Sequence, residues 1–209
     1  MRCKRNFKIN GGETLNRKMS EMQAALERRK QMSDGRLWAS RIAKDVYLGR
    51  GSDAQNLDKL KGHGITHVLN VADDVPNYYP NEFVYCNLNV ADFGAEIGGI
   101  GKSFKKAFEF VRNNNISGEI MEEYCSSNDG VDRKNTLLIH CANGSNRSCT
   151  MTIALMMELH GWSLKQAHTH VKKCRRSCIP LRDNIEELLK FEKAKFKTNE
   201  NSMTRKGFH

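Results

Sequence analysis

The sequence predicts an α/β domain with a mostly parallel central sheet flanked by helices. Segments rich in β-branched and apolar residues alternate along the chain with segments of helical periodicity, an order typical of parallel strands joined by helices. Strands are indicated at 46–49 and 66–71 by β-forming residues, and at 83–90 by alternation of apolar with polar residues. The run 136–139 is continuously apolar, which is the pattern of a strand covered on both faces.

Helices are predicted between these strands and after the last of them. Residues 53–62 resemble a helix, and apolar residues at helical spacing indicate another over 104–111. The almost wholly apolar run 150–159 indicates a helix at the centre of the domain, which ends at Gly161. Two further helices begin with capping-box pairs, Ser163 with Gln166 and Asp183 with Glu186.

The 209 residues, 39% of them hydrophobic, are enough for one core, which we place at 36–196. Residues 1–35 are predicted to be a mobile basic extension with a short helix that begins at Ser20. Residues 197–209 are predicted to be a flexible basic tail, and the polar stretch 113–135 to be a surface insertion. No apolar run approaches the roughly 18 residues that cross a bilayer, so we expect no membrane span.

Charge and cysteine content limit the cellular compartment and the kinds of binding partner that we expect. The basic N-terminus lacks the apolar stretch of a secretory signal, and seven cysteines show no disulfide framework, so we expect reduced thiols and a cytoplasmic or nuclear location. The net charge of +10 attracts phosphoproteins, nucleic acids and anionic lipids alike. We interpret basic runs such as 172–176 as solvated surface, so the charge alone does not decide the function.

The segment with the clearest chemistry is a strand, His140-Cys141, five residues, Arg147 and then a helix. Small residues at a helix N-terminus let backbone N–H groups converge on one point, where the helix dipole adds positive potential. Gly144 permits a close approach of the backbone, and Arg147 can form two hydrogen bonds with a phosphate. We therefore predict a loop that binds phosphate or another oxyanion, with these members: Ala142, Asn143, Gly144, Ser145 and Asn146.

The same positive potential favours a thiolate, so Cys141 is the candidate nucleophile toward a bound phosphomonoester. Ser148 follows the arginine. Its hydroxyl can donate a hydrogen bond to the Cys141 sulfur when that sulfur is the leaving group in the breakdown of the covalent intermediate. His140 is a supporting residue. A cysteine buried at a strand end for structural reasons alone would not require this whole pattern.

This segment resembles the signature of the protein tyrosine phosphatase superfamily, and specifically its small (atypical) dual-specificity branch. The similarity also covers residues 40–49 and the stretch 60–71, LKGHGITHVLNV. The resemblance implies hydrolysis of phosphotyrosine and of phosphoserine or phosphothreonine in a protein substrate, with no metal or other cofactor. It also implies a general acid at Asp92, which protonates the leaving oxygen and later activates water. Asp73 and Asp74 are the rival acids.

Asn146 departs from this branch, which usually carries serine immediately before the arginine, and the insertion 113–135 is longer than usual. Three alternatives follow. An RNA 5′-triphosphatase of the same fold suits the Gly-x-Asn-Arg sequence of 144–147 and the net charge, although that group typically lacks the acid at Asp92. A catalytically weak docking module is the second. A phosphoinositide phosphatase is disfavoured because 142–146 contains no Lys or Arg.

Two cysteine features fall outside this loop. Four residues close in sequence suggest a zinc site, although packed or solvated helix residues explain them more simply: His168, His170, Cys174 and Cys178. Cys149 lies close enough in sequence to Cys141 to suggest that it traps an oxidised nucleophile as a disulfide.

Overall fold

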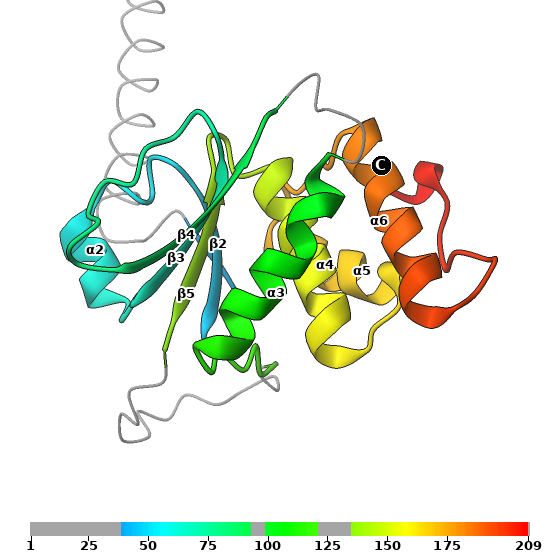
Figure 1. Cartoon of the computed structure of the whole chain (residues 1–209), viewed down its shortest axis with the longest axis horizontal. Coiled ribbons are helices and arrows are strands. Elements are labelled where there is room, and N and C mark those ends of the chain that lie inside the picture. The colour runs from blue at the N-terminus through cyan, green and yellow to red at the C-terminus, as the bar shows by residue number, and fades with distance from the viewer. Residues whose placement is uncertain (1–38, 93–98, 121–134, 209) are drawn as a thin grey trace, which may run out of the picture. The chain divides into compact units, whose positions relative to one another are not determined.

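The computed structural model describes residues 39–92, 99–120 and 135–208, whose centre is a mostly parallel sheet (Figure 1). The strands lie in the order β1-β2-β5-β3-β4, and each neighbouring pair is parallel except β1 with β2. Their bounds are Ser40–Ala43 (β1), Val46–Arg50 (β2), His67–Ala72 (β3), Val84–Val90 (β4) and Leu137–Cys141 (β5). The predicted α/β class is confirmed.

Helices cover both faces of the sheet, and Figure 1 shows α3 to α6 on one side and α2 on the other. The bounds are α2 Leu57–Gly62, α3 Phe104–Asn113, α4 Arg147–His160, α5 Leu164–Cys174 and α6 Arg182–Phe196, with single 3₁₀ turns at Ile100–Ser103 and Arg205–Phe208. The predicted Ser163–Gln166 capping box is present at α5. The capping pair predicted at Asp183 is wrong, because α6 begins at Arg182 and its N-cap, Leu181, has no side-chain cap.

The central strand β5 divides the core. Leu137 and Ile139 belong to the large cluster formed with α3 to α6, whereas Leu138 belongs to the smaller cluster on the side of Leu60 from α2. This alternation is what a strand with both faces covered requires. Helix α4 follows directly and is buried from Arg147 to Met157, so strand and helix together hold the connecting loop rigidly.

The predictions for the periphery concern the extension 1–35, the insertion 113–135 and the tail 197–209. The expected extension 1–35 lies outside the described residues, as does most of the predicted insertion, 121–134. The part of the insertion that is described lies against the domain, because buried Asp45 accepts hydrogen bonds from the backbone N–H groups of Ser117 and Gly118.

The tail expected to be flexible is packed instead. Ser202 donates from its backbone N–H and its hydroxyl to the buried carboxylate of Glu192, and Phe208 is 1% exposed within the main core. The domain therefore extends to Phe208, twelve positions beyond the predicted boundary at residue 196. Phe208 anchors this otherwise polar segment together with Met203, which packs against the same core.

Candidate active site

The predicted loop lies between the end of β5 and the start of α4, with Cys141 as the last residue of the strand and Arg147 as the first of the helix. The Cys141 sulfur is buried and lies 3.2 Å from the backbone nitrogen of Gly144, which donates to it. The Ser148 hydroxyl lies at the same distance, 3.2 Å, from that sulfur. The sulfur thus lies at the N-terminus of α4, beside one backbone N–H donor and one hydroxyl.

Gly144 makes the tight loop possible. Its φ of +65° is a conformation that side chains rarely adopt, and an added Cβ would lie 2.6 Å from the Gly49 carbonyl oxygen and 2.7 Å from the Arg175 guanidinium. Both the backbone angle and the lack of space therefore require glycine.

The loop is also held from outside, by residues that sequence patterns did not reveal as part of the site. Arg175 donates from Nε to the Gly144 carbonyl at 2.7 Å, Gly51 donates its backbone N–H to Ala142, and Ile179 donates its own to Ser145. The interpretation of Arg175 as solvated surface charge is wrong, since the residue is buried. Its position in a run of basic residues concealed this role.

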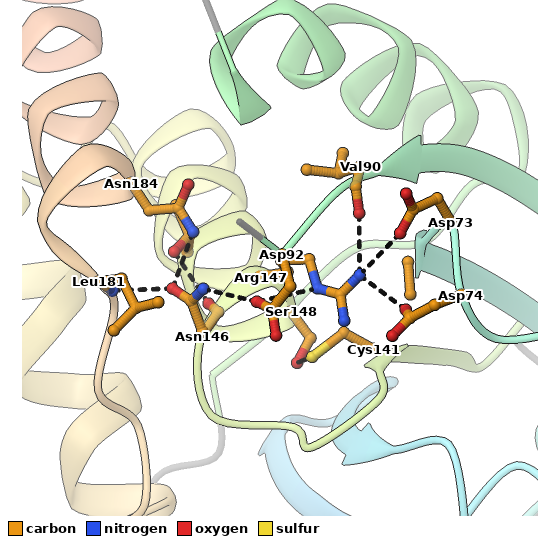
Figure 2. Close-up of polar contacts among 12 residues, drawn as sticks. Asp73, Asp74, Val90, Asp92, Cys141, Asn146, Arg147, Ser148, Leu181 and Asn184 are labelled. Carbon is orange, nitrogen blue, oxygen red and sulfur yellow. Dashed lines mark hydrogen bonds and ion pairs between the residues drawn. The ribbon is translucent and has the colours of Figure 1, made fainter. Parts of the chain in front are cut away.

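Arg147 is the largest fully buried polar group at the site, with a side chain only 1% exposed. Nη1 donates to the Val90 carbonyl and to the carboxylates of Asp73 and Asp74, at 2.9, 3.2 and 2.8 Å (Figure 2). Nη2 is buried and has no hydrogen-bond partner among the described residues. A buried guanidinium N–H without an acceptor is suited to an anionic ligand.

Three carboxylates surround this guanidinium and differ in their situation. Asp92 Oδ1 lies 3.3 Å from Arg147 Nε, and the Asp92 side chain is 24% exposed, whereas those of Asp73 and Asp74 are 45% and 55% exposed. The hydrogen bond from Arg147 lowers the pKa of Asp74, which makes Asp74 a poor proton donor at neutral pH. Of the predicted acid and its two rivals, Asp92 is the most sheltered.

Asn146 occupies the position where the sequence departs from the phosphatase signature that it resembles. Its side chain is 8% exposed and links three parts of the chain. Nδ2 donates to Asp92 Oδ1 at 2.9 Å, and Oδ1 accepts from the Leu181 backbone N–H and from Asn184, each at 2.8 Å (Figure 2). Sequence patterns gave no sign of this connection between the loop, the acid and the start of α6.

His140, the predicted supporting residue, is fully buried. Neither ring nitrogen has a hydrogen-bond partner among the described residues, and burial lowers the pKa of His140 to about 4. The ring is therefore neutral at physiological pH. Among the other loop members, Asn143 is exposed, while Ala142 and Ser145 are half-buried.

Of the four residues considered for zinc, His170 Nε2 and Cys174 Sγ lie 3.8 Å apart, but the four do not form one group. His168 packs against Phe208, and His170 contacts the Ile42 carbonyl. No group of metal-ligating side chains is found within the described ranges. Cys149 points its thiol toward the Gly144 carbonyl at 3.4 Å, and burial raises the pKa of that thiol well above its usual value. Such a thiol is a poor partner for an oxidised Cys141.

Comparison with known proteins agrees with the geometry. A family model described as dual specificity phosphatase, catalytic domain, matches residues 46–194. Protein phosphatase Slingshot of Drosophila melanogaster is 32% identical over 70% of this chain, and this chain covers 12% of that protein. Dual specificity protein phosphatase 1 of Arabidopsis thaliana is 30% identical over 74% of this chain and 69% of the plant protein.

The solved structure of human DUSP28 shares the fold, with a TM-score of 0.63 and 22% identity over 77% of this chain and 96% of that one. The chain therefore spans about an eighth of the length of the fly Slingshot relative, but most of the length of a small phosphatase domain. Within the described parts of the chain, no helix is long and apolar enough to cross a membrane.

Proposed function

Because this chain belongs to the dual specificity phosphatase family, we propose that it hydrolyses phosphotyrosine and phosphoserine or phosphothreonine in proteins through a phosphocysteine on Cys141. One observation carries the proposal. The Cys141 sulfur accepts from the Gly144 N–H and lies beside the Ser148 hydroxyl. Both contacts are made at the N-terminus of α4, whose first residue is the buried Arg147.

In the first step, a phosphate group enters the loop, where backbone N–H groups and Arg147 Nη2 bind its oxygens. The Cys141 thiolate attacks phosphorus, the S–P bond forms and the P–O bond to the substrate breaks. Asp92 gives its proton to the leaving oxygen, because an alkoxide or a tyrosine phenolate leaves poorly without one.

In the second step, the ionised Asp92 removes a proton from water, which attacks phosphorus and releases phosphate. The electrons of the S–P bond return to the Cys141 sulfur. Ser148, 3.2 Å away, donates its hydroxyl hydrogen to that sulfur and stabilises the returning thiolate. The loop and Arg147 carry the phosphoryl charge in both steps.

The proposal is tested by phosphate release from phosphotyrosine and phosphothreonine peptides. We expect turnover of both by the chain, none by Cys141→Ser, and a loss of about 10²- to 10⁴-fold for Asp92→Asn. Cys174→Ser is the matched control, since Cys174 lies on α5 outside the loop and should leave turnover unchanged.

A second arm uses RNA with a 5′-triphosphate end. Faster release from this RNA than from either peptide would contradict the protein substrate and favour the alternative activity. Turnover that survives in Cys141→Ser would exclude Cys141 as the nucleophile. A folded chain that binds phosphopeptide without turnover would indicate a docking module instead.

A further inference from the structure

We propose that Asn146 is a positioning residue that holds Asp92 in place for proton transfer and anchors it to the start of α6. This inference rests on the proposed function, because it concerns the acid of the same reaction. It assigns a role to the residue that differs from the serine usual in the family.

The contacts of Asn146 form a continuous path from Asp92 to the start of α6. Asp92 Oδ1 accepts from Asn146 Nδ2 at 2.9 Å, and on its other side the Asn146 amide oxygen accepts from the Leu181 N–H and Asn184 Nδ2 (Figure 2). The acid that follows β4 is thereby connected, through one buried amide, to the N-cap and first turn of α6.

The Asn146 amide has only one orientation that satisfies its partners on both sides. A backbone N–H can only donate, so the Leu181 N–H requires the Asn146 oxygen on its side. The Asn146 NH₂ group must then face Asp92 Oδ1, which accepts its hydrogen bond and leaves Oδ2 to carry the proton. The hydrogen-bond partners therefore decide which terminal atom of the Asn146 side chain is the oxygen and which is the nitrogen.

The Asn146 side chain does not cap its own helix. It is the N-cap residue of α4, a position where asparagine commonly accepts a hydrogen bond from the first turn of its own helix. Here the side chain makes no such bond, and its φ and ψ of −109° and −85° direct the backbone differently from an extended cap. The side chain serves the bridge between Asp92 and α6 instead.

Asn146 still holds Asp92 when a phosphate occupies the loop. Arg147 Nε also lies near Asp92 Oδ1, at 3.3 Å, but a phosphate in the loop competes for that guanidinium. The Asn146 side chain faces Asp92 and α6, so its amide keeps its partner when the Arg147 guanidinium also binds the ligand. With Oδ1 held by Asn146, Oδ2 is the oxygen that carries the proton to the leaving group. Serine, which is shorter and has a single oxygen, cannot reach both Asp92 and Leu181.

The test uses Asn146→Ser and two aryl phosphates. Phenyl phosphate resembles phosphotyrosine, whose phenol has a pKa of about 10 and needs a proton to leave. A fluorinated umbelliferyl phosphate has a much more acidic leaving group and needs none. Because kcat/KM reports the steps up to formation of phosphocysteine, it isolates the acid from the later breakdown. We expect Asn146→Ser to lower kcat/KM about tenfold for the first ester and less than about twofold for the second.

A double-mutant cycle with Asp92→Asn excludes a general loss of structure. In the Asp92→Asn background, Asn146→Ser should cause no further selective loss, because the residue acts only through the acid. Asn184→Ala, which removes one support of the Asn146 oxygen, should give a smaller loss with the same selectivity. Asn87→Ser is the matched control, an exposed asparagine on β4 that should change neither ester.

Equal losses on both esters, no loss on either, or a full additional selective loss in the Asp92→Asn background would each overturn the positioning role while leaving the phosphatase proposal intact. Failure of the unmodified chain to hydrolyse both esters would overturn both proposals together. Melting temperatures of all variants establish that each is folded under the assay conditions.

Discussion

Gly144 is the residue on which the loop geometry depends most directly, and its replacement gives a sharp prediction. In Gly144→Ala the new Cβ meets the Gly49 carbonyl at 2.6 Å, and the φ of +65° adds strain of about 1–2 kcal/mol. The loop must shift, so its N–H groups no longer converge on one point. We expect kcat/KM for a phosphotyrosine peptide to fall by about 100-fold or more.

Gly161 provides the matched control for this experiment. It has nearly the same φ, +64°, but nothing lies within 4 Å of an added Cβ. Gly161→Ala should therefore introduce the same backbone strain without a steric clash. We expect the free energy of unfolding in urea to fall by about 1–2 kcal/mol and kcat/KM to stay unchanged. Equal kinetic losses in the two variants would mean that backbone strain alone, rather than the close contact at Gly144, governs activity.

At the residue scale, site residues that lie close together in the sequence could be predicted. Site residues that only folding brings to the loop could not. Cys141, Arg147 and Ser148 share one strand–loop–helix segment, so their roles follow from local spacing. Arg175 and Asn184 reach the loop from distant positions, and their contacts depend on how α5 and α6 pack. No local pattern distinguishes a buried arginine in a basic run from its solvated neighbours.

At the scale of elements, the C-terminal segment gives the clearest departure from expectation and the next prediction. Phe208 is 1% exposed, and its ring centroid lies 4.6 Å from that of His168 on α5. Removing this ring leaves a cavity in the main core. We expect Phe208→Ala to lower the free energy of unfolding by about 3–4 kcal/mol, measured by urea denaturation.

Phe196, at the end of α6, is the comparison residue because it is 40% exposed. Phe196→Ala should cost less than about 1 kcal/mol. A loss for Phe208→Ala as small as that expected for Phe196→Ala would indicate that the Phe208 ring is not buried in solution, as the prediction of a flexible tail had assumed. A loss confined to Phe208→Ala would identify residues 197–208 as part of the folding unit.

Local signals located most elements but not those that depend on tertiary partners. The Ser163–Gln166 capping box was predictable because both of its hydrogen bonds are made within four residues. The start of α6 was not, because the side chain that meets the Leu181 N–H belongs to Asn146, far along the chain. The antiparallel strand β1 was likewise not separated from β2 in the sequence, since only their pairing defines it.

At the scale of the whole molecule, the predicted sheet explains why the site lies where it does. Strands β3, β4 and β5 are parallel, so their carboxyl ends meet at one edge of the sheet. Asp73 and Asp74 follow β3, Asp92 follows β4, and Cys141 ends β5. Predicting a parallel sheet was therefore enough to bring the acids near the nucleophile, although not to choose among them.

The last prediction concerns the whole molecule, because its stability should fall as the pH is lowered from about 7 toward 5. Burial lowers the pKa of His67, His140 and His168 in the folded state, to about 4 for His140. In the unfolded chain each titrates near 6.5, so below that pH the unfolded state binds more protons and is favoured. For each histidine the free energy of unfolding falls by at most about 1.4 kcal/mol per pH unit.

Two carboxylates also have shifted pKa values, but they do not reverse the fall in the free energy of unfolding between pH 6.5 and 5. Burial raises the pKa of Asp53, which favours the folded state on acidification, while the Arg147 hydrogen bond lowers that of Asp74, with the opposite effect. Asp74 therefore acts in the same direction as the three histidines, and Asp53 alone opposes them, so the slope between pH 6.5 and 5 keeps the sign that the histidines give it. Urea unfolding at pH 7, 6 and 5 measures the slope, and His140→Asn should make it shallower. An unchanged slope in this variant, or a His140 ring that titrates near pH 6.5 by NMR, would show that the ring is accessible to protons in the folded state.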